Sequence, residues 1–242
     1  MEFNTQTKVK DIALSDPAAR QILEEVGVDY CCGGGKSLHD ACVDASASPE
    51  VILNRLRENS SHPLPGDANW LAAPLRELIS HIREKHHRYV REAIRRTEAL
   101  FQKVIAKHGP NHQELSDIHS AFAEVSREML LHMRKEEQIL FPYIESLELA
   151  VAEHRPMEPP FFETVKNPVH AMMKDHDASG ELLKRIRNLA ANYTPPPDAC
   201  LSFKSLYEDL KQFESDLHQH VHLENNILFP RAVELELALP PA

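Results

Sequence analysis

Two segments of the sequence, residues 132–142 and 220–230, repeat one pattern of histidine, glutamate and apolar residues. Both read H-x-x-x-E-x-x-I-L-F-P, and the second copy begins 88 residues after the first. A weaker match precedes each copy, where His87 and His176 are each followed by a glutamate and an aliphatic residue at the same spacings. The pattern indicates two copies of one helical hairpin.

The spacing within each copy has a chemical meaning. A histidine and a glutamate four residues apart stand one turn from each other on the same face of a helix. In both copies that face also carries the apolar residues, so both pairs are expected to point into a core. A buried carboxylate is costly unless it is paired or binds a cation. The sequence therefore predicts a two-metal site with six ligands: His87, His132, Glu136, His176, His220 and Glu224.

Other interpretations of these residues exist. A single H-x-x-x-E is usually a surface pair, and the duplication on two apolar stripes argues against that here. Core ion pairing without metal is the remaining alternative. Imidazole with carboxylate suits iron, zinc or manganese; redox-active iron is the natural choice, although zinc would also bind. Glu128 and Asp175 are candidates to orient the imidazoles, or else solvated acids.

Several further histidines lie near the predicted ligands. His86 is closer to the centre of its apolar stripe than His87, but the repeat aligns His87 with His176. His81 is a nearby non-ligand, and His218 and His222 fall at helical angles far from the inward face. We expect His218 and His222 on the surface.

The elements that would position this site are helices. The chain has 242 residues with only 7 glycines, and breaker-rich stretches at 107–111, 155–160 and 194–197 separate four long amphipathic segments. Pro168 behind Asn167 is expected to restart the third helix. This arrangement predicts an all-α protein with a four-helix bundle over residues 69–236.

A small helical domain is expected over residues 1–62, before the breaker-rich stretch 59–66. Ser15-Asp16-Pro17 would begin one of its helices, which Gly27 would end, and Ser48-Pro49-Glu50 would begin another. Whether this domain docks on the bundle is left open by the sequence.

The bulk properties narrow the function classes. A formal charge of −10 argues against nucleic acid as a partner. No apolar run approaches the roughly 20 residues that cross a membrane. The first residues lack a signal-peptide core, so a cytoplasmic location is expected. The four cysteines do not form a secreted disulfide pattern, and we expect reduced thiols.

The motifs together resemble a known family. Lone histidines with paired H-x-x-x-E motifs are similar to the hemerythrin-like metal-binding domain. Asp29-Tyr30-Cys31-Cys32-Gly33-Gly34-Gly35 resembles the short domain that precedes it in the repair of iron centres family. The resemblance implies a hemerythrin-like bundle with two iron ions, oxo- or hydroxo-bridged, on the six residues above. It implies repair of iron–sulfur clusters damaged by nitric oxide or oxidants, with damaged iron–sulfur proteins as partners.

The vicinal Cys31 and Cys32 suggest a second role. Thiolates beside glycines would be accessible and could accept iron, a nitrosyl group or a damaged cluster as transfer thiols. Alternatively, they end a helix and pack against the bundle. Cys42 and Cys200 are expected to be plain buried thiols.

Three functions share the same predicted site. These are iron donation to damaged clusters, reduction of nitric oxide as an enzyme, and binding of oxygen or nitric oxide as in hemerythrin. Oxygen storage would not require the cysteine segment, which favours the first two. A sensor or scaffold is the outside option, and the oligomeric state, monomer or homodimer, stays open.

Overall fold

The computed structural model describes residues 3–59 and 69–240, and within these ranges the chain is built from helices. The only pairing of extended backbone among them is an isolated bridge between Lys8 and Ser37. The predicted all-α class is confirmed. Most of the predicted break at 59–66 lies outside the described residues.

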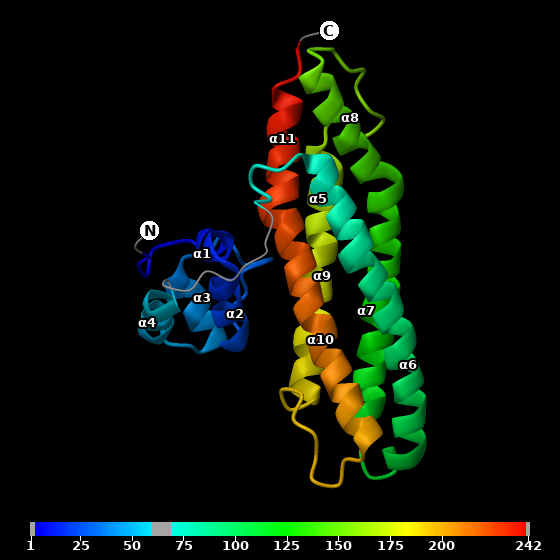
Figure 1. Cartoon of the computed structure of the whole chain (residues 1–242). Helices are drawn as coiled ribbons and strands as arrows, with labels where there is room; N and C mark the ends of the chain where they lie inside the picture. Colours follow the sequence, from blue (N-terminus) through cyan, green and yellow to red (C-terminus); the bar gives the residue numbers. More distant parts are fainter. Residues whose placement is uncertain (1–2, 60–68, 241–242) are drawn as a thin grey trace.

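Four long helical rods form the bundle (Figure 1). The rods are, in order, α5 (Leu75–His81), η1 (Ile82–His87) and α6 (Arg88–His108); α7 (Glu114–Lys135), η2 (Glu136–Leu140) and α8 (Phe141–Ala152); α9 (Lys166–Leu189); and α10 (Leu201–Leu223), η3 (Glu224–Leu228) and α11 (Phe229–Leu237). The rods α6 and α10 pack along each other, as do α7 and α9. The three predicted breaks fall between rods. The third helix begins two residues earlier than expected, so Asn167 lies inside it and is not its cap.

Wide π-helical turns interrupt three of the rods at or beside the predicted ligands. His87 ends η1, Glu136 begins η2 and Glu224 begins η3. In the last two, Pro142 and Pro230 follow as the second residues of α8 and α11. A proline ring clashes with the carbonyl four residues earlier in a regular helix, and a wider turn relieves that clash. The I-L-F-P part of the repeat thus accounts for two of the wide turns.

The N-terminal segment forms four short helices beside the bundle (Figure 1): α1 (Val9–Ser15), α2 (Pro17–Glu25), α3 (Leu38–Ala45) and α4 (Pro49–Asn59). Asp16 caps α2, where its Oδ1 accepts a 2.7 Å hydrogen bond from the Ala18 N–H, and Pro17 follows as the first helical residue. Gly27 adopts a positive φ of 72° after the helix, which favours glycine. The predicted starts at residues 16–17 and 48–49 are confirmed.

This segment docks on α10 and η3, a point the sequence left open. The Tyr30 ring lies edge-on to His222, with centroids 5.4 Å apart, and the Asn226 amide donates a 3.0 Å hydrogen bond to the Tyr30 carbonyl. His218 Nδ1 lies 2.9 Å from a Glu24 carboxylate oxygen. The expectation of surface positions is therefore wrong for His222, which is buried, and His218 is only half-buried. The docked segment covers both.

In the described residues, no helix has the length and apolar character needed to span a membrane.

Gly34 provides a test of this docking. A Cβ at Gly34 would meet the Tyr30 carbonyl at 2.8 Å and Asn226 Oδ1 at 3.0 Å, whereas a Cβ at Gly35 would meet nothing within 4 Å. We predict that Gly34→Ala destabilises the docked segment by about 1–3 kcal/mol because the backbone must shift. Gly35→Ala should stay within about 0.5 kcal/mol of the parent. Native-state hydrogen exchange of α1–α4 measures both, and equal protection in the two variants would contradict the close approach.

Candidate metal centre

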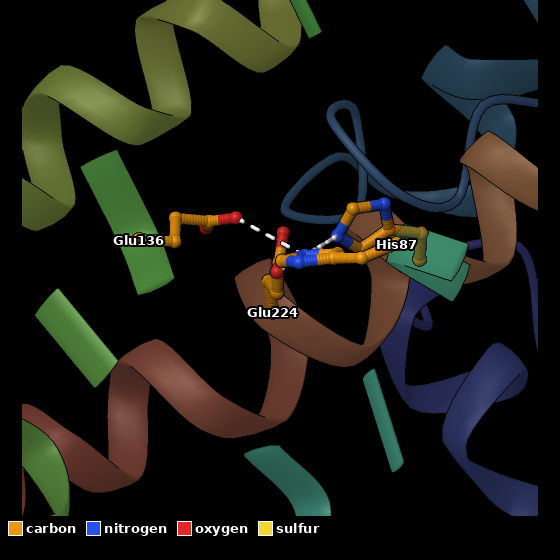
Figure 2. A group of neighbouring side chains, drawn as sticks. His87, Glu136 and Glu224 are labelled. Atoms are coloured by element: carbon orange, nitrogen blue, oxygen red, sulfur yellow. Dashed lines mark hydrogen bonds and ion pairs between the residues drawn. The ribbon is translucent and has the colours of Figure 1, made fainter. Parts of the chain in front are cut away.

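The six predicted ligands converge at one place in the bundle. Two groups of four side chains each bring their ligand atoms within 4.8 Å of one another: His87, Glu136, His220 and Glu224; and His132, Glu136, His176 and Glu224. Figure 2 shows His87, Glu136 and Glu224 pointing toward one another from different rods. Both glutamates belong to both groups. The arrangement therefore offers two metal positions that share two carboxylates.

Each oxygen of Glu136 faces a different group. Oε1 lies 3.3 Å from His132 Nε2, and Oε2 lies 3.4 Å from His87 Nε2. Both oxygens are buried without a hydrogen-bond partner among the described residues. Two unsatisfied carboxylate oxygens in a core are expensive, so the donor set fits a cation placed between the oxygens and the rings.

Glu224 has the same arrangement. Oε1 lies 2.9 Å from His220 Nε2, and Oε2 lies 3.1 Å from His176 Nε2. Ring nitrogens also face each other across the bundle, at 3.2 Å between His87 and His220. Lone pairs of two rings and a carboxylate directed at one point suit a metal ion.

The centre lies between two apolar parts of the bundle core. One cluster contains buried residues that precede the ligands on α7 and α10, such as Met129 and Leu217, and the other contains residues that follow them, such as Phe141 and Phe229. All six predicted ligands are at most 1% exposed. Water therefore does not compete for the carboxylates, and the charge must be balanced by protons or metal.

The pKa directions describe that balance without metal. Burial favours the neutral forms, yet His132 lowers the pKa of Glu136, and His220 together with His176 holds the pKa of Glu224 well below its usual value. Burial would lower the pKa of His132, but Glu136 and Asp175 raise it to about 10. Burial lowers the pKa of His220. The ionised carboxylates thus hold a proton on His132, and a metal would displace that proton.

Three side chains contact the rings of the predicted ligands at Nδ1, the outer ring nitrogen that faces away from the site. Glu137 Oε1 lies 2.7 Å from His87 Nδ1, and Asn225 Oδ1 lies 2.9 Å from His176 Nδ1. Asp175 Oδ2 lies 3.4 Å from His132 Nδ1, as the sequence suggested. Such partners fix the ring orientation and would direct Nε2 at a bound metal. Glu128 makes no such contact in the described part of the chain, so that suggestion is wrong.

Glu137 and Asn225 were missed as supports. Each directly follows a ligand glutamate in the two copies of the repeat, and this shared position was the available signal.

His86 is buried but belongs to neither group. Its Nδ1 lies 3.0 Å from Asp216, and its ring stacks on His220 with centroids 5.8 Å apart. Both His86 and His87 are buried, and both lie in the wide turn η1. The choice of His87 over His86 for the convergent set thus agrees with the geometry.

The vicinal cysteines differ from the expectation of two accessible thiolates. Cys31 is buried, and the adjacent Cys32 thiol, burial and the Asp29 carboxylate raise the pKa of Cys31 well above its usual value. Cys32 is half-buried. Neither ends a helix, because α2 stops at Glu25.

Both thiols line a cavity of about 700 Å³ between the N-terminal segment and the bundle. The wall of this cavity also includes His176 and Met129.

The chain matches two family models. Residues 78–232 match the hemerythrin HHE cation-binding domain, and residues 5–60 match a domain of unknown function, DUF542. It is 34% identical to a probable iron–sulfur cluster repair protein of Haemophilus influenzae, over 94% of this chain and 97% of the relative. It is also 34% identical to the iron–sulfur cluster repair protein YtfE of Escherichia coli, over 92% and 94% of the two chains. The chain belongs to the repair of iron centres family. Its histidine and glutamate clusters lie inside the cation-binding domain of that family.

Metal-free protein should lose stability at alkaline pH. The folded-state pKa of His132, about 10, exceeds its unfolded value of 6.5, so its stabilising charge is complete below pH 6.5 and disappears as pH rises toward 10. We expect the urea midpoint of the metal-free protein to fall over this range. His132→Gln, which has no titrating ring, should fall less. An identical pH dependence in the two proteins would disprove the pairing of His132 with the carboxylates.

Proposed function

We propose that this protein is a non-haem di-iron protein that repairs iron–sulfur clusters damaged by nitric oxide or oxidants. The observation that carries the proposal is the sharing of Glu136 and Glu224 between two groups of ligand atoms. The relatives are named as iron–sulfur cluster repair proteins, and their similarity extends over nearly the whole of this chain. Damaged iron–sulfur proteins are the proposed clients, and the cytoplasm is the proposed compartment.

The chain's own residues would divide the work as follows. Glu136 and Glu224 would each give one oxygen to each iron, and two histidines would complete the protein ligands of each. Bound iron would supply a labile Fe²⁺ cargo and a redox-active centre for small ligands such as nitric oxide or oxygen. Glu137, Asp175 and Asn225 would hold the rings in place.

The cavity beside Cys31 and Cys32 supports a transfer role for these thiols. Asp29 Oδ1 lies 3.3 Å from Cys31 Sγ, and the three side chains offer ligand atoms within 4.8 Å of one another. The Asn225 amide that contacts His176 also donates a 3.4 Å hydrogen bond to the Cys31 carbonyl. His176, a proposed iron ligand, is therefore linked through Asn225 to the loop that carries Cys31 and Cys32, and His176 and both cysteines line the same cavity. This arrangement favours iron transfer over simple oxygen binding.

Nitric oxide reduction is the second candidate. The same cavity reaches His176, so a small molecule could approach the centre from this side. Nitrous oxide formed in proportion to reduced protein would favour the enzyme over the iron donor.

Removing either shared carboxylate should remove the metal. We predict that Glu136→Ala and Glu224→Ala each lose most of the iron, because each glutamate contributes to both positions. Glu214→Gln is the matched control, since Glu214 is also buried on α10 but contacts Tyr193 and Arg187. Iron content after anaerobic purification measures the effect. Full iron in the two alanine variants would refute the shared-carboxylate centre.

Replacing both Cys31 and Cys32 by serine should abolish repair while leaving the iron content intact. The measurement is the recovery of an iron–sulfur enzyme inactivated by nitric oxide, after addition of the iron-loaded protein. Cys42→Ser is the control, because Cys42 is buried in the N-terminal core away from the centre. Unchanged recovery with the double variant would exclude these thiols, and no recovery with the parent protein would refute repair itself.

A further inference from the structure

A second cluster of metal-type donors lies at the C-terminal end of helix α6, whose other end adjoins the proposed iron centre. His108, His112 and Asp198 bring ligand atoms within 4.8 Å of one another. His108 ends α6, 21 residues after His87, which is roughly 30 Å at about 1.5 Å per helical residue. The cluster joins the α6–α7 connection to the α9–α10 connection, which lie at the same end of the bundle (Figure 1).

The turn that follows α6 holds His108 and His112 on the same side of the chain. The His112 N–H donates a 2.9 Å hydrogen bond to the His108 carbonyl, which keeps helical spacing past the end of α6. Both rings pack edge-on against the buried Phe203, each with centroids 5.3 Å apart. Their positions are therefore fixed before any ligand binds.

The outer nitrogen of His112 already has the partner that a metal ligand requires. Nδ1 lies 2.9 Å from Glu114 Oε1, while Nε2 faces both oxygens of Asp198 at 3.1 Å. A carboxylate on one ring nitrogen fixes the tautomer and frees the other for a metal. The facing of Nε2 and carboxylate repeats the geometry found at the proposed iron centre.

Cys200 supplies a sulfur next to this cluster. Its Sγ lies 3.2 Å from His108 Nε2. It precedes α10, where the N–H of Phe203 lowers the pKa of the Cys200 thiol. The earlier expectation of a plain buried thiol is wrong, because Cys200 is half-buried and faces a histidine.

We infer that the three converging side chains of His108, His112 and Asp198 bind a divalent metal ion of the zinc type, and that Cys200, which lies beside His108 but outside that group, turns in as the fourth ligand. Two neutral imidazoles, a carboxylate and a thiolate carry two negative charges, which balance one divalent cation, and zinc accepts this mixture of donors in four-coordinate sites. The metal would cross-link the α6–α7 and α9–α10 connections at the end of the bundle. Because it binds only the folded chain, it would stabilise that chain. The inference does not depend on the repair function.

Cobalt provides a selective probe of this site. The proposed iron centre contains no thiolate, so a sulfur-to-cobalt charge-transfer band reports on cysteine ligation alone. The full-length, iron-loaded protein with Cys31→Ser and Cys32→Ser is titrated with Co²⁺. We expect one equivalent of the band, lost when Cys200→Ser is added. Absence of the band, or its survival with Cys200→Ser, would overturn the site.

Zinc binding and thermal stability give the second readout. We expect one zinc per chain beyond the two irons and a higher Tm with added Zn²⁺. Asp198→Asn, at an exposed position, should weaken zinc binding by at least about tenfold. His119→Asn is the matched control, because His119 forms a similar pair with Glu98 at 2.9 Å but has no third donor among the residues that the structure describes. A Tm shift that Asp198→Asn leaves unchanged would show that the cluster is an ion-pair network only.

Discussion

Two carboxylates buried in the middle of a helical bundle are the constraint on which this structure depends. Glu136 and Glu224 are fully shielded from water and lie between two apolar clusters. Bare charges in such a place would oppose folding by several kcal/mol per ion. The four histidines offset this cost, because either protonated rings or a metal bound to the rings neutralises the carboxylates. Metal binding and folding of this core are therefore thermodynamically coupled.

The two copies of the helical hairpin that form the centre differ in the residues next to the predicted ligands. The residue after the ligand glutamate is Glu137 in one copy and Asn225 in the other, and the residue before the lone ligand histidine is His86 in one and Asp175 in the other. Asn225 is the side chain that also reaches the N-terminal segment. The two copies thus diverge in the supports of the rings while keeping the predicted ligands themselves, and Asn225 of the second copy connects its ring to the N-terminal segment.

Local sequence patterns predicted most of the fold and of the candidate site. The features that they missed depend mainly on tertiary contacts. The repeat located the convergent residues because helix periodicity and the cost of buried charge are properties of the sequence itself. The wide turn η1 has no proline signal, so this turn was not predictable from the sequence. His222 became buried only because Tyr30, nearly 200 residues away in sequence, packs against it. Such docking depends on the surface of another folded unit, which periodicity does not report.

The buried state of Cys31 sets a condition on the proposed transfer role. A thiol whose pKa lies well above its usual value stays protonated at neutral pH and is a poor nucleophile. A cation nearby reverses this, because it stabilises the thiolate more than the thiol. Acceptance of Fe²⁺ between Asp29, Cys31 and Cys32 would then release protons, and departure of the metal would restore them. Thiols that ionise only when a cation arrives can pass iron onward without holding buried thiolates in between, just as His132 holds a proton at the metal-free centre until a metal displaces it.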